Sequence, residues 1–567
     1  MDHRHERAAG PLTGAAATAI APPATPTPTR SPTARTRRAT AVRVGVALLV
    51  ASLLVWLGPP GTDFAAHVYQ RAVFLKHGFV LWDNYWYSGR YSFINYSLLY
   101  YPLAGLVGNK ALAVGSFVVA TLAFTLVASR EWGPASRWST LSFAVIWSAF
   151  VLTGAFPFDL GIALVLSALV AAQAHRYVIC AVLTLLTAAA SPLAFVLLAL
   201  ILLAVGLNKR VSGGAWRWIA CALGAAGAVE FALFRLFPSG GSFPFSIDAL
   251  AGALALCGGI ALLTRGSDRA RPLRWIALAL AAACVASYLV PSSVGANIIR
   301  FRFAALPLVL LAVSIGRPPP RLVAVAAVAL AGCWNLAPLV AGFASASRDA
   351  SASPRYWRPA LRFLTAHLTP SFRVEAVDSA HHWAAAYLPA AGIPVVRGWF
   401  RQDDLPQNRI LYGPLTKGSY LRWLRGLGVR YVVLTDAPPD VSSGKESSLL
   451  RSGRSGLIRV FATRHLAILA VPSPRPIVTG PGPARVLELQ RAGLRVRLPR
   501  SGTYRLAVHY SPYWRTSTGC LVASRSGMMR LTVKRPAVAR LTFSVSLDKA
   551  ADVLAGEQPE RCSPATG

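Results

Sequence analysis

Apolar segments about as long as a bilayer is thick recur from residue 42 to residue 343, and this feature limits the fold most strongly. A helix of about 20 residues crosses the roughly 30 Å hydrocarbon core of a membrane. With 54% hydrophobic and 14% charged residues, the 567-residue chain is too apolar for an ordinary soluble fold. We therefore expect an α-helical multi-spanning membrane protein. About eleven spans are predicted, near 42–57, 111–129, 138–153, 158–174, 177–190, 192–207, 216–236, 247–264, 274–290, 301–316 and 321–343.

The formal net charge of +36 comes mostly from arginine. Such a charge raises the question of nucleic-acid binding. The arginines, however, are spread over membrane flanks and the C-terminal region, so no nucleic-acid partner is expected. Membrane lipids and phosphate groups are the better partner class. The preference for arginine over lysine is equally compatible with GC-rich coding.

Charge in the loops predicts the orientation. Residues 1–40 are rich in Ala, Pro, Thr and Arg and are predicted to be a disordered, basic cytoplasmic tail. Alternate loops between the later spans are rich in arginine, and the positive-inside rule places them in the cytoplasm as well. With an odd number of spans, residues 344–567 are expected outside the cell membrane. The basic loop residues are Arg130, Arg137, Arg176, Lys209, Arg210, Arg217, Arg265, Arg269, Arg271, Arg274, Arg317 and Arg321.

Three segments outside the spans carry their own patterns. The outer loop 58–110 is dense in aromatic residues and is predicted to form helices on or in the outer leaflet. Residues 344–480 alternate helix-like and strand-like patterns, which indicates an extracytoplasmic α/β domain. Residues 481–567 contain short alternating strands, which indicates a small β-sandwich. In an oxidising compartment Cys520 and Cys562 could form a disulfide.

Carboxylates at a membrane border are costly, so those predicted to face outward form a site hypothesis. Asp63 opens a predicted helix and has His67 on the same face, four residues on. It could equally be a helix N-cap. Asp159, in FPFDLG, lies at a second outer turn and could also be a cap. Together Asp63 and Asp159 could hold a divalent cation, Mg or Mn, or share general-base work.

Arginine and aromatic residues complete the candidate site. Arg300 and Arg302 enter the membrane from the outer side, where they could snorkel or could bind phosphate. Asp83 also faces outward, and the aromatic cluster from Trp82 to Tyr101, which includes Trp86, could stack on sugars or line the path of a lipid. The adjacent His381 and His382 are predicted to be a solvated pair, because no other ligands lie nearby at metal-binding spacing.

Five stretches carry a resemblance to a known family: GTDFAAHVYQ, WDNYWYSGRY, FPFDLG, IIRFRF and RGWFRQDD. Together with the order of spans and outer segments, they make the chain resemble the GT-C superfamily of membrane glycosyltransferases, particularly multi-spanning proteins of actinobacterial type. The architectural resemblance covers about residues 41–343. It implies a polyprenyl-phosphate sugar donor, Asp63 as catalytic base or metal-site residue, and Asp159 as the second outer acid. It also implies that Arg300 or Arg302 binds the donor phosphate. The chain departs from the family pattern where Phe64 follows Asp63, since many relatives have paired acids there.

The expected function is therefore transfer of a sugar from a polyprenyl-phosphate donor to a glycan or lipid acceptor of the cell envelope. In this hypothesis Asp63 and Asp159 are catalytic, and His67, Asp83, Trp86, Arg300 and Arg302 bind substrate. The alternative is a non-catalytic scaffold, or a glycan-binding assembly factor, that kept the architecture and lost the chemistry. A transporter is less favoured, because its charges would lie at the bilayer midplane.

Overall fold

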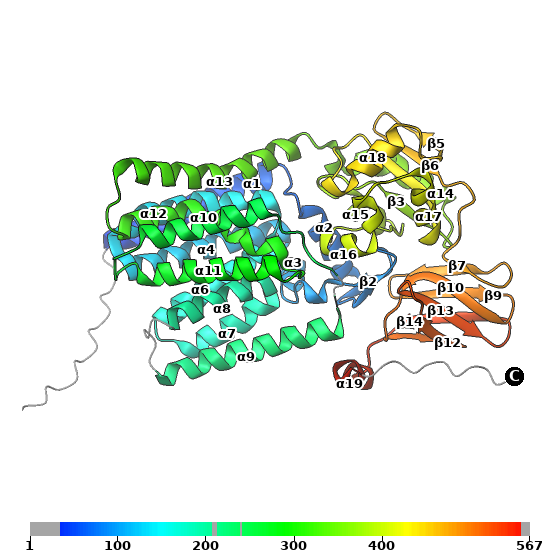
Figure 1. Cartoon of the computed structure of the whole chain (residues 1–567), viewed down its shortest axis with the longest axis horizontal. Coiled ribbons are helices and arrows are strands. Elements are labelled where there is room, and N and C mark those ends of the chain that lie inside the picture. The colour runs from blue at the N-terminus through cyan, green and yellow to red at the C-terminus, as the bar shows by residue number, and fades with distance from the viewer. Residues whose placement is uncertain (1–33, 207–212, 239–240, 557–567) are drawn as a thin grey trace, which may run out of the picture.

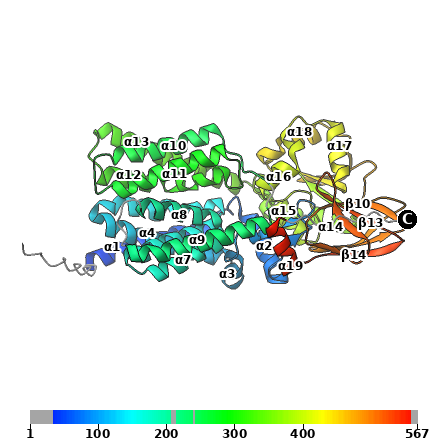
Figure 2. The same cartoon turned by 60° about the horizontal axis from the view of Figure 1, so that its bottom comes forward.

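The structure, a computed structural model, describes residues 34–206, 213–238 and 241–556. A helical bundle forms one half of the molecule, and an α/β unit and a β-sandwich sit together at one end of it (Figure 1). Within the bundle, α10 to α13 form a layer over α1, α4 and α6 to α9 (Figure 2). The predicted fold class is confirmed in this arrangement of apolar helices followed by α/β and β units.

Each predicted span coincides with a helix of the bundle. Seven segments of the described chain are long and apolar enough to cross a membrane, whereas α7, α8 and α10 are shorter. The number of crossings therefore stays a prediction. The bundle helices are α1 (Ala34–Leu57), α4 (Asn109–Trp132), α5 (Arg137–Ala149), α6 (Phe156–Gln173), α7 (Tyr177–Ala190), α8 (Pro192–Gly206), α9 (Gly213–Leu236), α10 (Ile247–Leu263), α11 (Arg271–Leu289), α12 (Ala305–Ile315) and α13 (Arg321–Ser347).

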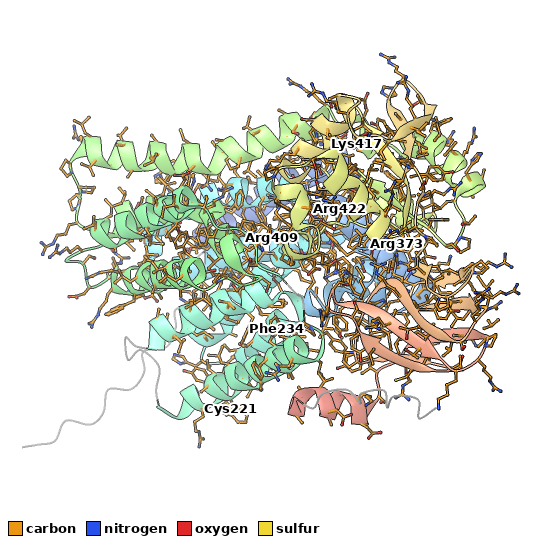
Figure 3. All side chains as sticks on the ribbon, turned by 45° about the vertical axis from the view of Figure 1, so that its right-hand side comes forward. Cys221, Phe234, Arg373, Arg409, Lys417 and Arg422 are labelled. Carbon is orange, nitrogen blue, oxygen red and sulfur yellow. The ribbon has the colours of Figure 1, made fainter. Side chains whose placement is uncertain are left out.

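The surface of this bundle is apolar, as a bilayer requires. On α13, Leu322 and Leu330 are 85% and 71% exposed. Phe234, labelled on α9 in Figure 3, is 50% exposed. In water such a surface would be unfavourable, because apolar patches of this extent drive association. In the hydrocarbon core of a bilayer the same apolar side chains contact apolar lipid chains, so their exposure is not unfavourable.

The two ends of the bundle collect different loops. At one end Trp132 Nε1 donates a hydrogen bond to the Arg269 carbonyl (3.0 Å), which joins two of the arginine-rich loops. At the other end Asp63 N donates to the Thr153 carbonyl (2.9 Å), and Phe243 N donates to the Ser292 carbonyl (2.9 Å). The loops predicted to be cytoplasmic therefore share one end, and the loops predicted to be outside share the end that carries the C-terminal units.

The predicted N-terminal boundary is wrong in one respect. Helix α1 begins at Ala34, so the last residues of the segment predicted to be disordered, up to Thr40, are helical. They form a basic first turn that continues directly into the apolar part of the helix. Residues 1–33 lie outside the described residues, as does Cys562, so the disordered tail and the disulfide with Cys520 stay predictions.

The outer loop folds against the C-terminal units and only partly as predicted. It contains α2 (Phe64–His77), the short strands β1 (Trp82–Asp83) and β2 (Arg90–Tyr91), a 3-10 turn η1 (Phe93–Asn95) and α3 (Tyr100–Val107). The aromatic residues from Trp82 to Tyr101 are buried or half-buried and do not lie open to sugar or lipid, whereas Phe79 is 58% exposed. Trp82 stacks on Phe543 with ring centroids 5.0 Å apart, and Tyr87 Oη donates to the Phe400 carbonyl (2.8 Å). The aromatic density therefore builds an interdomain core, which exploits the large area that such rings bury.

The α/β unit has one mixed sheet in the order β3-β4-β6-β5, in which β3 and β4 are parallel and the other pairs antiparallel. Its strands are β3 (Arg373–Ala376), β4 (Val429–Thr435), β5 (Ile458–Ala462) and β6 (Leu466–Ala470). Its helices are α14 (Pro354–His367), α15 (Ala384–Ala390), α16 (Arg401–Gln407), α17 (Lys417–Gly426) and α18 (Gly444–Arg451).

The β-sandwich packs two four-stranded antiparallel sheets on a shared core that includes Val496, Leu506, Leu531 and Leu541. Strand β7 lies just before the predicted boundary at residue 481, and α19 (Leu547–Ala555) packs against α9. One sheet has the order β12-β13-β10-β7 and the other β11-β14-β9-β8. The strands are β7 (Val478–Thr479), β8 (Arg485–Gln490), β9 (Gly493–Leu498), β10 (Gly502–His509), β11 (Trp514–Thr516), β12 (Cys520–Ala523), β13 (Met528–Val533) and β14 (Ala537–Phe543).

Candidate functional site

Two glycines fix the backbone at Asp63. Gly154 has φ +71°, and a Cβ added there would lie 2.7 Å from Phe64 N and 2.9 Å from Asp63 N. A Cβ on Gly61 would in turn lie 2.5 Å from Gly154 N. The loop before α2 and the turn before α6 thus touch backbone to backbone, an approach that only glycine permits. This contact sets the place of Asp63 at the outer end of the bundle.

The Asp63 carboxylate is not used as a helix cap. Asp63 occupies the N-cap position of α2, but its side chain makes no capping hydrogen bond. Instead its Oδ1 accepts a hydrogen bond from Trp399 Nε1 (3.1 Å), and its Oδ2 lies 3.9 Å from an Arg300 Nη2 atom. About one fifth of the side chain is exposed (19%). The carboxylate is therefore positioned by two neighbours and still open on one side.

That open side faces a cavity of about 410 Å³, which Asp63, Arg300 and Arg302 line together. The Arg302 guanidinium lies over the rings of Phe303 (5.0 Å) and Trp334 (6.0 Å), and it forms no ion pair within the described part of the chain. Stacking on rings leaves the N–H groups of an arginine available for an anion. The other walls are nearly all apolar: Thr62, Phe150, Leu152, Thr153, Ala155, Phe243, Ala296, Ile299, Phe303, Pro338, Leu339 and Gly342.

Asp159, predicted as the second catalytic acid, does not line this cavity. Its side chain is fully buried, and its Oδ1 accepts a hydrogen bond from Trp147 Nε1 (3.0 Å). It lies in the first turn of α6, where a carboxylate also suits the positive end of the helix dipole. The structure thus gives Asp159 a buried structural setting, and its catalytic role stays a prediction that the geometry does not favour.

His67 is likewise buried and away from the cavity walls. Its Nδ1 lies 3.0 Å from Tyr101 Oη. Burial, with a smaller contribution from the nearby Arg300 charge, lowers the pKa of His67 to about 3. A neutral, buried imidazole on the inner face of α2 serves packing, so the geometry does not support His67 as a substrate ligand.

Asp83 and Trp86, also predicted to bind substrate, hold the outer loop to the C-terminal units. Asp83 accepts a hydrogen bond from Tyr69 Oη (2.7 Å) and pairs with Arg491 Nη1 at 3.2 Å. Trp86 is fully buried, and its Nε1 donates to the Ala385 carbonyl (2.8 Å). Both side chains are satisfied by distant parts of the chain, so neither is free to meet a sugar.

Residues of the α/β unit that the sequence reasoning missed lie close to Asp63. Trp399, its hydrogen-bond donor, belongs to the stretch RGWFRQDD, which was noticed but given no role. The prediction that His381 and His382 are solvated is wrong, because only 4% and 8% of these residues is exposed.

Each of the two histidines pairs with an acid. His381 Nδ1 lies 2.8 Å from Asp349 Oδ2, and His382 Nδ1 lies 2.8 Å from Asp378 Oδ2. Burial is the largest single influence and opposes the charged form of His382, but the Asp378 carboxylate, aided by the charges of Asp440 and Asp63, raises the pKa of His382 overall. Asp349 lies far from His381 in sequence, so local sequence gave no sign of that pair, whereas Asp378 precedes His382 by only four residues and could have indicated the other.

The predicted Mg or Mn site finds no fitting set of ligands. Within the described ranges, no three His, Cys, Asp or Glu side chains gather as a metal site. Asp63 and Asp159 are engaged by different tryptophans, and only Asp63 lines the cavity. A divalent cation usually needs several oxygen ligands from protein, substrate or water. The described residues around Asp63 therefore do not fit a divalent cation, and the Mg or Mn site stays a prediction.

Comparison with known proteins returns solved structures only. No family model matches the chain, and no curated protein matches it. It is similar to the cryo-electron-microscopy structure of arabinofuranosyltransferase AftD from Mycobacteria, with 19% identity and a TM-score of 0.46 over 77% of this chain and 40% of that chain. A mutant of the same enzyme matches with 16% identity and a TM-score of 0.43 over 90% of this chain and 60% of that chain.

This chain thus spans less than two thirds of the length of these arabinofuranosyltransferases. The scores lie below 0.5 and the identities below one fifth. The proposal for its chemistry therefore rests on the cavity around Asp63 and not on this likeness.

Proposed function

We propose that the cavity around Asp63 transfers a sugar from a polyprenyl-phosphate donor to a glycan or lipid acceptor at the outer face of the membrane. The observation that carries this proposal is that one open carboxylate and two arginines line a single cavity with apolar walls. The donor has matching parts: an anionic phosphate, a sugar and a hydrocarbon chain. The two arginines suit the phosphate, the carboxylate suits the sugar and its acceptor, and the apolar walls of this 410 Å³ cavity suit the hydrocarbon chain.

The arginines serve the phosphate in this mechanism. A guanidinium presents paired N–H donors that fit phosphate oxygens, and such charge-assisted bonds are the stronger ones. Negative charge grows on the phosphate oxygen as its bond to the anomeric carbon breaks. Arg302, which has no carboxylate partner in the described chain, is placed to stabilise that charge in surroundings of low polarity.

Asp63 serves the acceptor. An acceptor hydroxyl attacks the anomeric carbon and forms the new glycosidic bond, while the carbon–oxygen bond to phosphate breaks and polyprenyl phosphate leaves. The hydroxyl proton passes to the Asp63 carboxylate, which acts as general base. The Trp399 hydrogen bond holds that carboxylate in place, so the α/β unit contributes to the geometry of the site.

One observation favours the second candidate, a scaffold without catalysis. Asp63 is the only acid among the residues that line this cavity, and Phe64 follows it in the sequence. A scaffold could bind the same lipid-linked sugar without consuming it. The two functions therefore differ in turnover and not in binding.

The test is an assay of purified full-length protein with polyprenyl-phosphate carrying labelled pentoses and hexoses, supplied with an envelope extract as acceptor. We expect Asp63→Asn to lower turnover by about 100-fold or more, since a general base contributes roughly 10² to 10⁴. Arg302→Gln should lower kcat/KM for the donor about tenfold, which corresponds to about 1.4 kcal/mol of lost transition-state stabilisation. Asp268→Asn, at the opposite end of the bundle, is the matched control and should change neither quantity. Full turnover in Asp63→Asn would exclude the mechanism, and donor binding without turnover in the wild type would establish the scaffold.

A further inference from the structure

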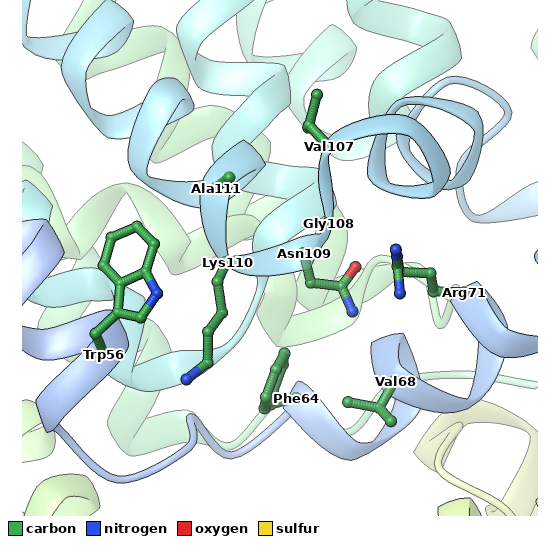
Figure 4. A pocket seen from close by; sticks show the side chains of 9 residues that line it. All are labelled: Trp56, Phe64, Val68, Arg71, Val107, Gly108, Asn109, Lys110 and Ala111. Carbon is green, nitrogen blue, oxygen red and sulfur yellow. The ribbon is translucent and has the colours of Figure 1, made fainter.

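A second cavity lies against α2, where α1 ends and α4 begins (Figure 4). Its volume is about 380 Å³. None of its lining residues belongs to the Asp63 cavity. It is lined by Trp56, Phe64, Val68, Arg71, Val107, Gly108, Asn109, Lys110 and Ala111.

Two cations line this cavity without a carboxylate. Lys110 is exposed at the start of α4, and its side chain extends between Trp56 and Phe64 in Figure 4. Arg71 donates from Nε to the Ala104 carbonyl (2.6 Å), which holds its guanidinium at the opposite side. Neither side chain forms an ion pair with any residue that the structure describes. Two uncompensated cations on one small cavity raise the local potential for an anion.

Asn109 and the start of α4 add donors between these cations. Asn109 is only 7% exposed, its Oδ1 accepts from Tyr100 Oη (3.2 Å), and its Nδ2 has no acceptor in the described chain. Its amide lies beside Arg71 in Figure 4. The N-cap residue of α4 is Gly108, which has no side chain to satisfy the first backbone N–H groups. A helix start of this kind favours an anion, because its free N–H groups and dipole point outward.

Apolar surface continues from the cations in two directions. A third cavity, of about 320 Å³, shares Phe64, Val68 and Lys110 with the second and reaches Trp383 and Tyr387 of the α/β unit. Val107, which lines the cavity, is 57% exposed, and Leu57 and Leu106, which adjoin the lining residues Trp56 and Val107 in the sequence, are 80% and 82% exposed. Half-exposed Trp56 at the last turn of a membrane-type helix is typical of the bilayer interface. The groove thus joins a cationic head region to surfaces suited to hydrocarbon.

We propose that this groove binds the phosphate headgroup of an anionic membrane lipid, with Lys110, Arg71 and the Asn109 amide on the phosphate and the acyl chains along Trp56 and Val107. The site combines two cations without an ion-pair partner in the described chain, an amide nitrogen without a protein acceptor there, and exposed apolar residues. This combination distinguishes a lipid from a soluble anion, which would gain nothing from the apolar walls. The site is separate from the Asp63 cavity, and the inference does not depend on glycosyl transfer.

The test uses purified full-length protein in zwitterionic nanodiscs that contain a trace of diazirine-bearing phosphatidylglycerol. Irradiation followed by peptide mass spectrometry locates the labelled residues. We expect labelling of the peptides around Trp56 and Val107, at least fivefold above that from a diazirine-bearing phosphatidylcholine. Lys110→Glu should lower this labelling at least fivefold, whereas Lys110→Arg should keep it. Lys76→Glu is the matched control, because Lys76 is an exposed lysine of α2 outside the groove, and it should label as the wild type does.

Three results would overturn the proposal. Equal labelling by the anionic and zwitterionic probes would show that charge is not recognised. Unchanged labelling in Lys110→Glu would show that the groove is not the site. Displacement of the label by millimolar inorganic phosphate at constant ionic strength would show that the site binds a free anion and not a lipid. Retained size-exclusion behaviour and helical circular dichroism of Lys110→Glu serve as the folding check.

Discussion

The acidic side chains near the outer end of this molecule are of two kinds: closed ones, whose carboxylates are held by several partners, and an open one, which has few. Asp404 accepts two hydrogen bonds from the Arg397 guanidinium, at 3.0 and 2.7 Å, and Asp83 is similarly held by Tyr69 and Arg491. Asp63 has one N–H donor and a guanidinium at the edge of ion-pair distance. Breaking a buried pair costs about 3–5 kcal/mol of stability, so the main role of the closed acids is to stabilise the fold. An acid held on one side and open on the other is the kind that can exchange a proton with a substrate.

The Asp378–His382 pair predicts a pH dependence of stability. Since Asp378 raises the pKa of His382 in the folded chain, the pair contributes its full stability below the unfolded pKa, about 6.5. That contribution is lost as the pH rises through the folded pKa. We expect the hydrogen-exchange protection factors of the backbone around residues 379–386, which are rates corrected for intrinsic exchange at each pH, to fall over that range in the wild type. In His382→Gln the dependence should disappear.

His465 offers the control for this experiment. It pairs with Asp436 at 2.7 Å, but both side chains are about half exposed, so solvent screens the pair. His465→Gln should therefore leave the pH dependence around residue 382 unchanged. Wild-type protection factors that stay flat with pH, or that rise as the pH rises, would contradict the assignment of a charged, buried pair.

At the scale of elements, the contact between the loop before α2 and the turn before α6 sets the geometry of the site. Gly154→Ala would place a Cβ 2.7 Å from Phe64 N and would strain a left-handed residue by about 1–2 kcal/mol. We expect transfer activity to fall at least tenfold, because the collision displaces Asp63. The measurement is turnover of the donor, with the melting temperature recorded beside it.

A second glycine separates displacement from strain. Gly133 also has positive φ, +57°, but a Cβ there would meet only an Arg269 side-chain nitrogen at 3.7 Å. With ψ −135°, Gly133 has a conformation less favourable for alanine than the αL conformation of Gly154, so Gly133→Ala should lose at least as much stability and still retain turnover. If both variants lose activity equally, strain alone explains the effect and the backbone contact at Asp63 has no special role.

The helices were predictable from the sequence, whereas the contacts of the outer loop were not. An apolar run is a property of consecutive residues and can be read from the sequence alone, so each predicted span coincides with a helix. The aromatic loop residues could be assigned to a bilayer interface or to a protein core by composition alone. Their partners decide the matter, and these lie far away in sequence: Ala385 for Trp86 and Arg491 for Asp83. For the same reason Asp63, Arg300 and Arg302 could be proposed together, but Trp399 could not.

At the scale of the whole molecule, the separation of basic loops from the C-terminal units predicts sidedness. We expect the β-sandwich to lie outside the cell and the α10–α11 loop to lie inside. Ser526→Cys, in an exposed turn of the sandwich, should react with a membrane-impermeant maleimide in intact cells. Arg265→Cys, exposed in the α10–α11 loop, should react only after permeabilisation. The reverse pattern would place the Asp63 cavity in the cytoplasm and contradict transfer at the outer face.

The Asp63 cavity is central to this account, and the position of a bound donor phosphate tests it most directly. A cryo-electron-microscopy structure of the full chain with a non-transferable polyprenyl-phosphate sugar analogue would show that position. The account predicts phosphate density within hydrogen-bond distance of the Arg300 or Arg302 guanidinium, with the anomeric carbon turned toward Asp63. Phosphate bound elsewhere, with the Asp63 cavity empty, would contradict it.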